Sequence, residues 1–298
     1  LAGQRQFHLA LAVYDRLASD GLKASAVTCS CLIGFATEVG ELERAVEFFQ
    51  MLSELTTPTI RAYMSVLRVH ARRQDFAASV ATLRDMERRK AGMDSLALNV
   101  VLATGVATDQ LDAVEQLVAE ASAKQPPLCD VVSYNTLIKG FAHRCNYENA
   151  ARIIGQMRHC GIPPNAISFN TVMDAAVRAG RASEAWTLLG EMRATGLRPD
   201  KFTCSILVKS LSKGATEPQV IRMLALLREV DQLCDSTLKA SLYNSVFEAA
   251  MAVGGSSGGT ALGAKVFTQM RQHKVQPAPS AQRLIVKSLP GAAMPDEG

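Results

Sequence analysis

The stretch DVVSYNTLIKGFAHRCNYENAARIIGQMRHCGIPPN, residues 130–165, is followed directly by AISFNTVMDAAVRAGRASEAWTLLGEMRATGLRPD, residues 166–200. When the two are laid over each other, the aromatic-Asn-Thr triplet at 134–136 falls on the triplet at 169–171. At the ends, Asn165 falls on Asp200. The chain therefore contains an internal repeat, and an Asn directly after the aromatic residue belongs to it.

The same spacing extends in both directions, with a period of about 35 residues. The last two complete units fit this period only if each contains an insertion of four residues. One insertion lies in GGSSGG at 254–259 and the other follows Asp235. We therefore predict one continuous array over 1–298. Its units are a partial repeat at 1–25, repeats at 26–59, 60–94, 95–130, 131–165, 166–200, 201–239 and 240–278, and a partial repeat at 279–298.

Each unit divides into two helices. SYNTLIKGFAHR (133–144) and AARIIGQMRH (150–159) both space their apolar residues for one face of a helix. In the polar break AGRAS, Gly180 can adopt the left-handed conformation that ends a helix, and Ser183 is placed to cap the next one. Since one hairpin cannot bury its apolar face alone, neighbouring hairpins must stack. The pattern predicts an all-α stack of helical hairpins.

The composition agrees with packed helices and excludes several other classes. The chain is 48% hydrophobic and only 5% aromatic, and small aliphatic residues favour closely packed helices. A net charge of +4 permits nucleic acid as a partner without demonstrating it. The seven cysteines form no CxxC pair, no apolar run is long enough to span a membrane, and no catalytic or metal-binding spacing stands out. Because the chain begins with Leu and in mid-repeat, we expect it to be a piece of a longer protein.

A hairpin of about 35 residues, of the form VVSYNTLI followed by Ala, Met and GIPPN, resembles the pentatricopeptide repeat. The resemblance covers residues 1–289 and is strongest at 131–200. The nearest rival, the tetratricopeptide repeat, needs Gly at its eighth position because its two helices touch there. This chain carries bulky residues at that position, namely Ile33, Leu67, Leu102, Ile138, Met173, Val208 and Phe247.

The resemblance implies an all-α, right-handed superhelical solenoid that binds single-stranded RNA, one base per repeat. It further implies that the fifth and last residues of a unit read the base edge, and that the second residues of neighbouring units clamp the base. An Asn offers both a donor and an acceptor to a base edge. An acidic or amide residue at the end of the unit can orient it, and an apolar second residue can cover a base face. No cofactor, metal or catalytic residue is implied.

Three consecutive units match the base-reading pattern best. Their reading pairs are Asn99 with Asp130, Asn135 with Asn165, and Asn170 with Asp200. The unit at 95–130 has one extra residue, so the choice of Asp130 over Cys129 is an inference. The family associates Asn–Asp with uracil and Asn–Asn with cytosine or, less strictly, uracil, which implies a pyrimidine core 5′-U-(C/U)-U-3′. The clamping residues are Leu96, Val132, Ile167 and Phe202.

Outside these units the pairs are less regular. Ser205 with Asp235, or with Lys239 if the insertion moves the last position, favours a purine. Asn244 is also a candidate reader, although its partner Ala278 cannot orient an amide. The pairs of the first two complete units, Ser30 with Thr59 and Met64 with Asp94, are not expected to read a base.

The family places a phosphate-binding cation near position 13 of each unit. Here that position carries Arg72, His143, Arg178 and Lys213, but also Glu38, Ala107 and Ala252. A cation at the end of a helix is also favoured by the helix dipole in any protein. Two cysteines, Cys29 and Cys204, stand where other units have an aromatic residue, which predicts that they are buried in the core rather than bound to metal.

Family resemblance also suggests an organelle, a mitochondrion or a chloroplast, and a role in RNA processing, stabilisation or translation. Two alternatives stay open from the sequence. The array can be a protein-binding scaffold of a ribosomal or transcription assembly that kept the repeats and lost the code. It can also be the RNA-binding segment of a larger enzyme.

Overall fold

The computed structural model describes residues 6–212, 214–253 and 255–288, except for the side chains of 212, 255–258 and 288. Its described part consists of α-helices and two short 3-10 turns, Ser210–Ser212 and Asp231–Leu233, without strands, which confirms the all-α fold. The first helices of the hairpins are α2 (Ala26–Val39), α4 (Ile60–Arg72), α6 (Ser95–Ala107), α8 (Val131–His143), α10 (Ala166–Arg178), α12 (Lys201–Lys209), α14 (Ser236–Ala252) and α16 (Pro279–Ser288). The second helices are α1 (Phe7–Ser19), α3 (Leu42–Leu55), α5 (Phe76–Arg88), α7 (Leu111–Ser122), α9 (Tyr147–His159), α11 (Ala182–Ala194), α13 (Glu217–Glu229) and α15 (Gly255–Gln272).

The residue just before a first helix is its N-terminal cap. Its side-chain oxygen accepts the backbone N–H three residues further on, as N-cap residues do. This holds for Ser25, Thr59, Asp94, Asp130, Asn165 and Asp200. Thus α2, α4, α6, α8, α10 and α12 begin at the first residues of the expected units. The exception is α14, which begins at Ser236 with Asp235 as its cap, so the four extra residues form an additional helical turn ahead of Ala240.

The turn between α10 and α11 agrees with the sequence in one residue and not in the other. Gly180 has φ of +75° and takes the left-handed conformation after the end of α10, as predicted. The prediction for Ser183 was wrong. Because α11 already begins at Ala182, the residue at its cap is Arg181, and the Ser183 hydroxyl donates instead to the carboxylate of Glu184 at 2.7 Å.

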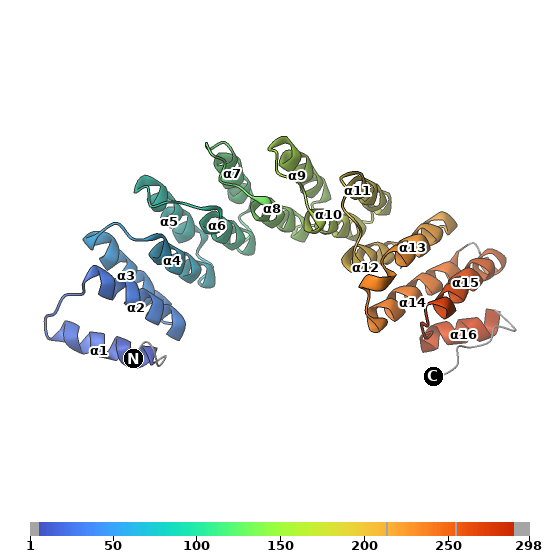
Figure 1. Ribbon diagram of the computed structural model, residues 1–298, viewed down its shortest axis with the longest axis horizontal. Helices are drawn as coiled ribbons and strands as arrows, with labels where there is room; N and C mark the ends of the chain where they lie inside the picture. Colours follow the sequence, from blue (N-terminus) through green and yellow to red (C-terminus); the bar gives the residue numbers. More distant parts are fainter. Residues whose placement is uncertain (1–5, 213, 254, 289–298) are drawn as a thin grey trace. The chain divides into compact units, whose positions relative to one another are not determined.

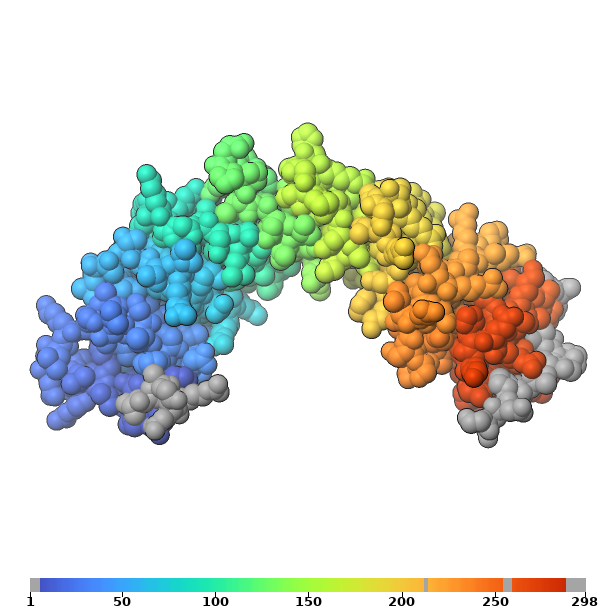
Figure 2. Space-filling model, in the orientation of Figure 1, coloured from blue at the N-terminus to red at the C-terminus, as the bar shows by residue number. Residues whose placement is uncertain are grey.

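The chain forms two compact units that divide at the end of α8. Unit 1 comprises the residues up to Phe141 with His159–Ile162, and unit 2 comprises Ala142–Arg158 with the residues from Pro163 on. Within unit 1, α2, α4 and α6 pack on α3, α5 and α7, and α4 packs on both α2 and α6. Within unit 2, α10, α12 and α14 pack on α11, α13 and α15 in the same way (Figure 1). In the space-filling view the colours within each unit follow one another in chain order, as expected of hairpins that contact their neighbours (Figure 2).

The core of each unit is formed where these helices meet. The bulky eighth residues, Val208 excepted, are completely buried: Ile33, Leu67, Leu102, Ile138, Met173 and Phe247. Cys29 and Cys204 are buried as predicted. No described helix is long and apolar enough to cross a membrane. The hairpins of each unit therefore bury their apolar faces against one another.

Candidate nucleic-acid interface

In unit 1, Asn99 and Asp130 lie in hydrogen-bond contact at the N-terminal end of α8. The Asn99 side-chain Nδ2 donates to Asp130 Oδ1 at 3.1 Å, and the Ser133 hydroxyl donates to Asn99 Oδ1 at 2.6 Å. Asp130 also caps α8 by accepting the Ser133 backbone N–H at 2.9 Å. The cap of one repeat thus holds the fifth residue of the preceding repeat in place.

Unit 2 contains the same arrangement around Asn170 and Asp200. Asn170 Nδ2 donates to Asp200 Oδ1 at 3.1 Å, and the Thr203 hydroxyl donates to Asn170 Oδ1 at 2.8 Å. Asp200 caps α12 through the Thr203 backbone N–H at 2.8 Å. Two repeats in separate units therefore build one geometry from the same residue types.

The charge of the carboxylate fixes the direction of the amide. Burial raises the pKa of Asp130, but hydrogen bonds from the Ser133 backbone N–H and from Asn99 outweigh it and hold the pKa below its ordinary value of 3.8. An ionised carboxylate only accepts hydrogen bonds, so the Asn99 NH₂ group must face it and the Asn99 oxygen must face the Ser133 hydroxyl. Each Asn then keeps one N–H and one oxygen lone pair for another partner.

Four exposed apolar side chains lie beside these pairs. Leu96 precedes Asn99 by three residues in α6, and Ile167 precedes Asn170 by three residues in α10, so each lies on the same helix face as its Asn. Leu96, Val132 and Ile167 are each 55% exposed and Phe202 is 61% exposed, although their helices bury most other large apolar residues. Side chains of this kind in these places suit contact with the face of a base.

Of the middle pair, Asn135 belongs to unit 1 and Asn165 belongs to unit 2. Asn135 is only 8% exposed. Asn165 caps α10 through the Ser168 backbone N–H at 3.1 Å. That Asn135 and Asn165 together read a base stays a prediction.

The remaining candidate readers have other partners. The Ser205 hydroxyl donates to the Lys201 carbonyl at 2.8 Å, Asp235 caps α14, and Lys239 pairs with Asp231 at 2.8 Å. The Asn244 Oδ1 accepts the Ala278 backbone N–H at 2.7 Å, and its Nδ2 donates to the Ala240 carbonyl at 2.7 Å. In the described structure these side chains do not form the network seen at Asn99 and Asn170.

The candidate phosphate ligands differ from one another in their surroundings. Arg72 Nη1 donates to the Thr37 carbonyl of the preceding first helix at 2.8 Å, and Arg178 Nε lies 2.9 Å from Asp174. His143 is exposed at the last residue of α8, and Lys213 lies outside the described residues. Phosphate binding by these residues stays a prediction.

The hydroxyls of Ser133 and Thr203 were not identified from the sequence. Each is the third residue of its helix. A Ser or Thr near the N-terminus of a helix is common, so neither residue stands out in the sequence of its own repeat. The signal that could have found it is the spacing Asp-x-x-Ser/Thr, which predicts a capping interaction and so places the hydroxyl near the capping carboxylate.

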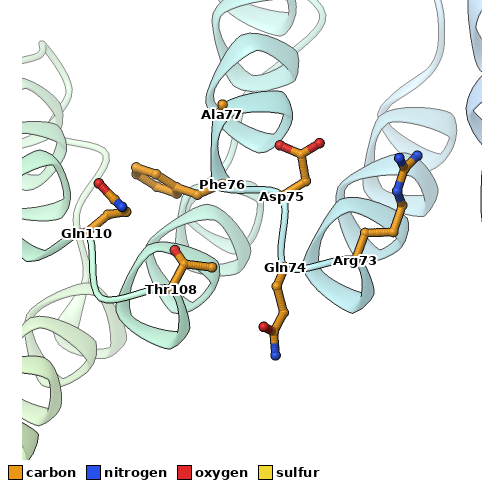
Figure 3. A pocket seen from close by; sticks show the side chains of 7 residues that line it. All are labelled: Arg73, Gln74, Asp75, Phe76, Ala77, Thr108 and Gln110. Atoms are coloured by element: carbon orange, nitrogen blue, oxygen red, sulfur yellow. The ribbon is translucent and has the colours of Figure 1, made fainter.

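A hollow of about 530 Å³ in unit 1 lies between the turn after α4 and the turn after α6 (Figure 3). Its lining contains Arg73, Gln74, Asp75, Phe76, Ala77, Thr108 and Gln110. Asp75 is the cap of α5 and accepts the Ala78 backbone N–H at 2.9 Å, so its carboxylate has a structural role. Among the residues that the structure describes, no cluster of His, Cys, Asp or Glu could hold a metal ion.

Two family models match this chain. One, described as pentatricopeptide repeat-containing protein, matches residues 2–121, and the other, the PPR repeat family, matches residues 130–176 and 164–213. Together they span more than half of the sequence. The chain belongs to the pentatricopeptide repeat family. No curated protein sequence matches it.

Two solved proteins share the fold of this chain. The protein PPR10 from maize superposes with a TM-score of 0.67 at 19% identity, over 96% of this chain and 42% of PPR10. The nuclear proteinaceous RNase P 2 of A. thaliana superposes with a TM-score of 0.54 at 11% identity, over 63% of this chain and 42% of that protein. PPR10 has also been solved in complex with an 18-nt psaJ RNA element, which matches at 18% identity with a TM-score of 0.44, over 95% of this chain and 45% of PPR10. The chain thus spans less than half the length of each of these proteins.

Proposed function

We propose that this chain binds single-stranded RNA with one base at each repeat and selects pyrimidines at its central repeats. The observation that carries the proposal is the shared geometry of Asn99–Asp130 and Asn170–Asp200. In each, an Asn amide is fixed in direction by a capping carboxylate and a hydroxyl, and apolar side chains lie exposed beside it. The binding of RNA by PPR10 supports the same class of ligand.

The proposed target contains 5′-U-(C/U)-U-3′, read by Asn99 with Asp130, Asn135 with Asn165, and Asn170 with Asp200. A fixed amide that retains one donor and one acceptor can pair with the edge of a pyrimidine. We place this activity in organellar RNA processing, stabilisation or translation, without catalysis by this segment. Any catalysis would come from another part of a longer protein.

The test is binding of the whole 298-residue chain to fluorescent 12-nt RNAs, U12, C12 and A12, at two salt concentrations. We expect pyrimidine RNAs to bind more tightly than A12, and affinity to fall with salt because phosphate contacts release counterions. In Asn99→Ala with Asn170→Ala, the preference should shrink by roughly tenfold or more, since contact with each base contributes about 1–3 kcal/mol. The matched control is Asn149→Ala, the same change on the second helix α9, which should leave the preference unchanged.

A sharper variant changes the code instead of deleting it. Asn170→Ser keeps Asp200 and Thr203 in place and creates the Ser–Asp pair that the family associates with a purine. The preference at one position should then move from U towards a purine in RNAs that differ only at that base. Equal, weak binding of every RNA by the parent chain would overturn base reading and favour the protein scaffold. The engaged side chains of Ser205 and Asn244 are the observation in favour of that alternative.

A further inference from the structure

In unit 2 the second helices α13 and α15 border a groove of about 410 Å³, here called the α13–α15 groove. Its lining is formed by Ile221, Leu224, Ala225, Arg228, Lys265, Thr268, Gln269 and Gln272. The lining therefore contains two cations, Arg228 and Lys265, and no carboxylate. Neither cation forms a salt bridge with a carboxylate in the described part of the chain.

In two other interfaces between second helices, a Glu of the later helix pairs with an Arg of the earlier one. Between α9 and α11, Arg158 pairs with Glu191 at 3.0 Å, and between α5 and α7, Arg84 pairs with Glu120. Each Glu directly precedes a buried residue of its helix, Met192 or Ala121. These carboxylates neutralise the arginine of the preceding repeat.

In α15 the residue in that place is Gln269, directly before the buried Met270. With its oxygen facing the guanidinium, the Gln269 amide accepts hydrogen bonds from Nη2 of Arg228 and from Nε at 3.0 Å. The contact between the repeats is thus kept while the negative charge is absent. The α13–α15 groove retains the positive charge that a Glu neutralises between α9 and α11 and between α5 and α7.

The lining favours a protein segment over RNA as the occupant. A guanidinium has five N–H donors, so Arg228 can hold Gln269 and still donate to an incoming carboxylate. Ile221 is 46% exposed and offers an apolar surface next to the cations. No aromatic side chain lines the groove, so a base has no ring to stack on. The groove also lies between second helices, whereas Asn170, Ile167 and Phe202 belong to first helices.

We propose that the α13–α15 groove binds an acidic, amphipathic segment of a partner protein. A carboxylate of the segment contacts Arg228 and Lys265, and an apolar side chain of the segment packs on Ile221. The proposal does not depend on base reading, because the residues of the groove and of the candidate RNA-binding face are different.

The test starts with a displayed library of 12-residue peptides, from which those that bind the whole chain are selected. Peptides that also bind the double variant Arg228→Gln, Lys265→Gln are then removed. The selected sequences should be enriched in Asp or Glu beside Leu, Ile or Phe. A synthetic peptide of the consensus should bind the parent chain at least tenfold more tightly than the double variant, as measured by calorimetry. The same peptide with each Asp or Glu replaced by Asn or Gln should bind the parent chain at least tenfold more weakly. This comparison leaves the protein itself unchanged.

Two further variants separate charge from folding. Gln269→Glu supplies the missing carboxylate to Arg228 and should weaken the peptide at least tenfold while the thermal melt stays cooperative. Arg222→Gln removes an exposed arginine of α13 that does not line the groove, and binding should stay within twofold. The proposal is overturned if the selected peptides lack acids, or if Gln269→Glu binds the acidic peptide as well as the parent. It is also overturned if no acidic peptide is selected and the double variant weakens U12 RNA tenfold, because the groove is then a phosphate site.

Discussion

One carboxylate oxygen holds each candidate base-reading pair together. Asp130 Oδ1 accepts the Ser133 backbone N–H at 2.9 Å and the Asn99 amide at 3.1 Å. The same residue therefore caps a helix and positions Asn99, the candidate base-reading side chain of the preceding repeat. A change in this carboxylate should be visible both in stability and in RNA selectivity.

Asp130→Asn separates these two effects. Asn is about as good an N-cap as Asp, so the variant should still fold with α8 capped. The pKa of Asp130 lies below 3.8 in the folded chain, so its contribution is present above the ordinary carboxyl value and is lost as pH falls through the folded-state value. Urea unfolding between pH 7 and 2 should show a shallower acid dependence in the variant, by about 1.5–3 kcal/mol for one charge-assisted hydrogen bond. An identical acid dependence in both chains would show that Asp130 is not held ionised by this network.

Ser133 is expected to position Asn99 without touching the RNA. Ser133→Ala removes the hydroxyl that faces Asn99 Oδ1 and should cost about 1 kcal/mol in stability and several-fold in the preference for U12 over A12. Ser133→Thr should restore both, because Thr203 makes the same contacts in unit 2. Thermal melts and fluorescence anisotropy measure the two quantities. A purely structural role predicts equal loss of affinity for U12 and A12.

At the level of the element, close packing between helices leaves no room for a side chain at Gly105, whereas Gly190 has room for one. A Cβ on Gly105 in α6 would lie 2.4 Å from Val114 Cγ2 and 2.6 Å from the Phe76 ring, whereas nothing lies within 4 Å of a Cβ on Gly190 in α11. Gly105→Ala should therefore destabilise unit 1 by about 1–3 kcal/mol. Gly190→Ala should stabilise its helix by up to about 1 kcal/mol, because Ala has the higher helix propensity. Denaturant unfolding of the two variants measures the change in the free energy of unfolding. The change should be negative for Gly105→Ala and positive for Gly190→Ala, and the same sign in both would contradict this difference in packing.

The helices were predictable from the sequence because their ends and faces are coded locally. A capping residue before an apolar pattern of helical spacing fixed where α10 and α12 begin. The extra turn of α14 was not predictable, because four inserted residues after Asp235 can form either a loop or helix. The contact between Ser133 and Asn99 was also out of reach, because it joins residues 34 positions apart and depends on how two repeats stack.

At the level of the whole molecule, stability is expected to be local within each unit. In the described residues, the helices that pack closely belong to the same hairpin or to adjacent hairpins, as expected of a repeat array. Unfolding of such an array need not be a single two-state transition. A core mutation should then weaken the repeats beside it and leave distant repeats protected.

Leu102→Ala tests this expectation. Leu102 is completely buried in α6, which packs on α4, α5 and α7, and truncation of a buried Leu costs about 2–5 kcal/mol. Hydrogen exchange followed by mass spectrometry should show faster exchange in α4–α7 and unchanged exchange in α13–α15. Equal acceleration in all of these helices would mean that the array unfolds as one cooperative body. RNA readout by the two units would then be coupled through stability, and Asn99→Ala and Asn170→Ala could not be treated as independent measurements.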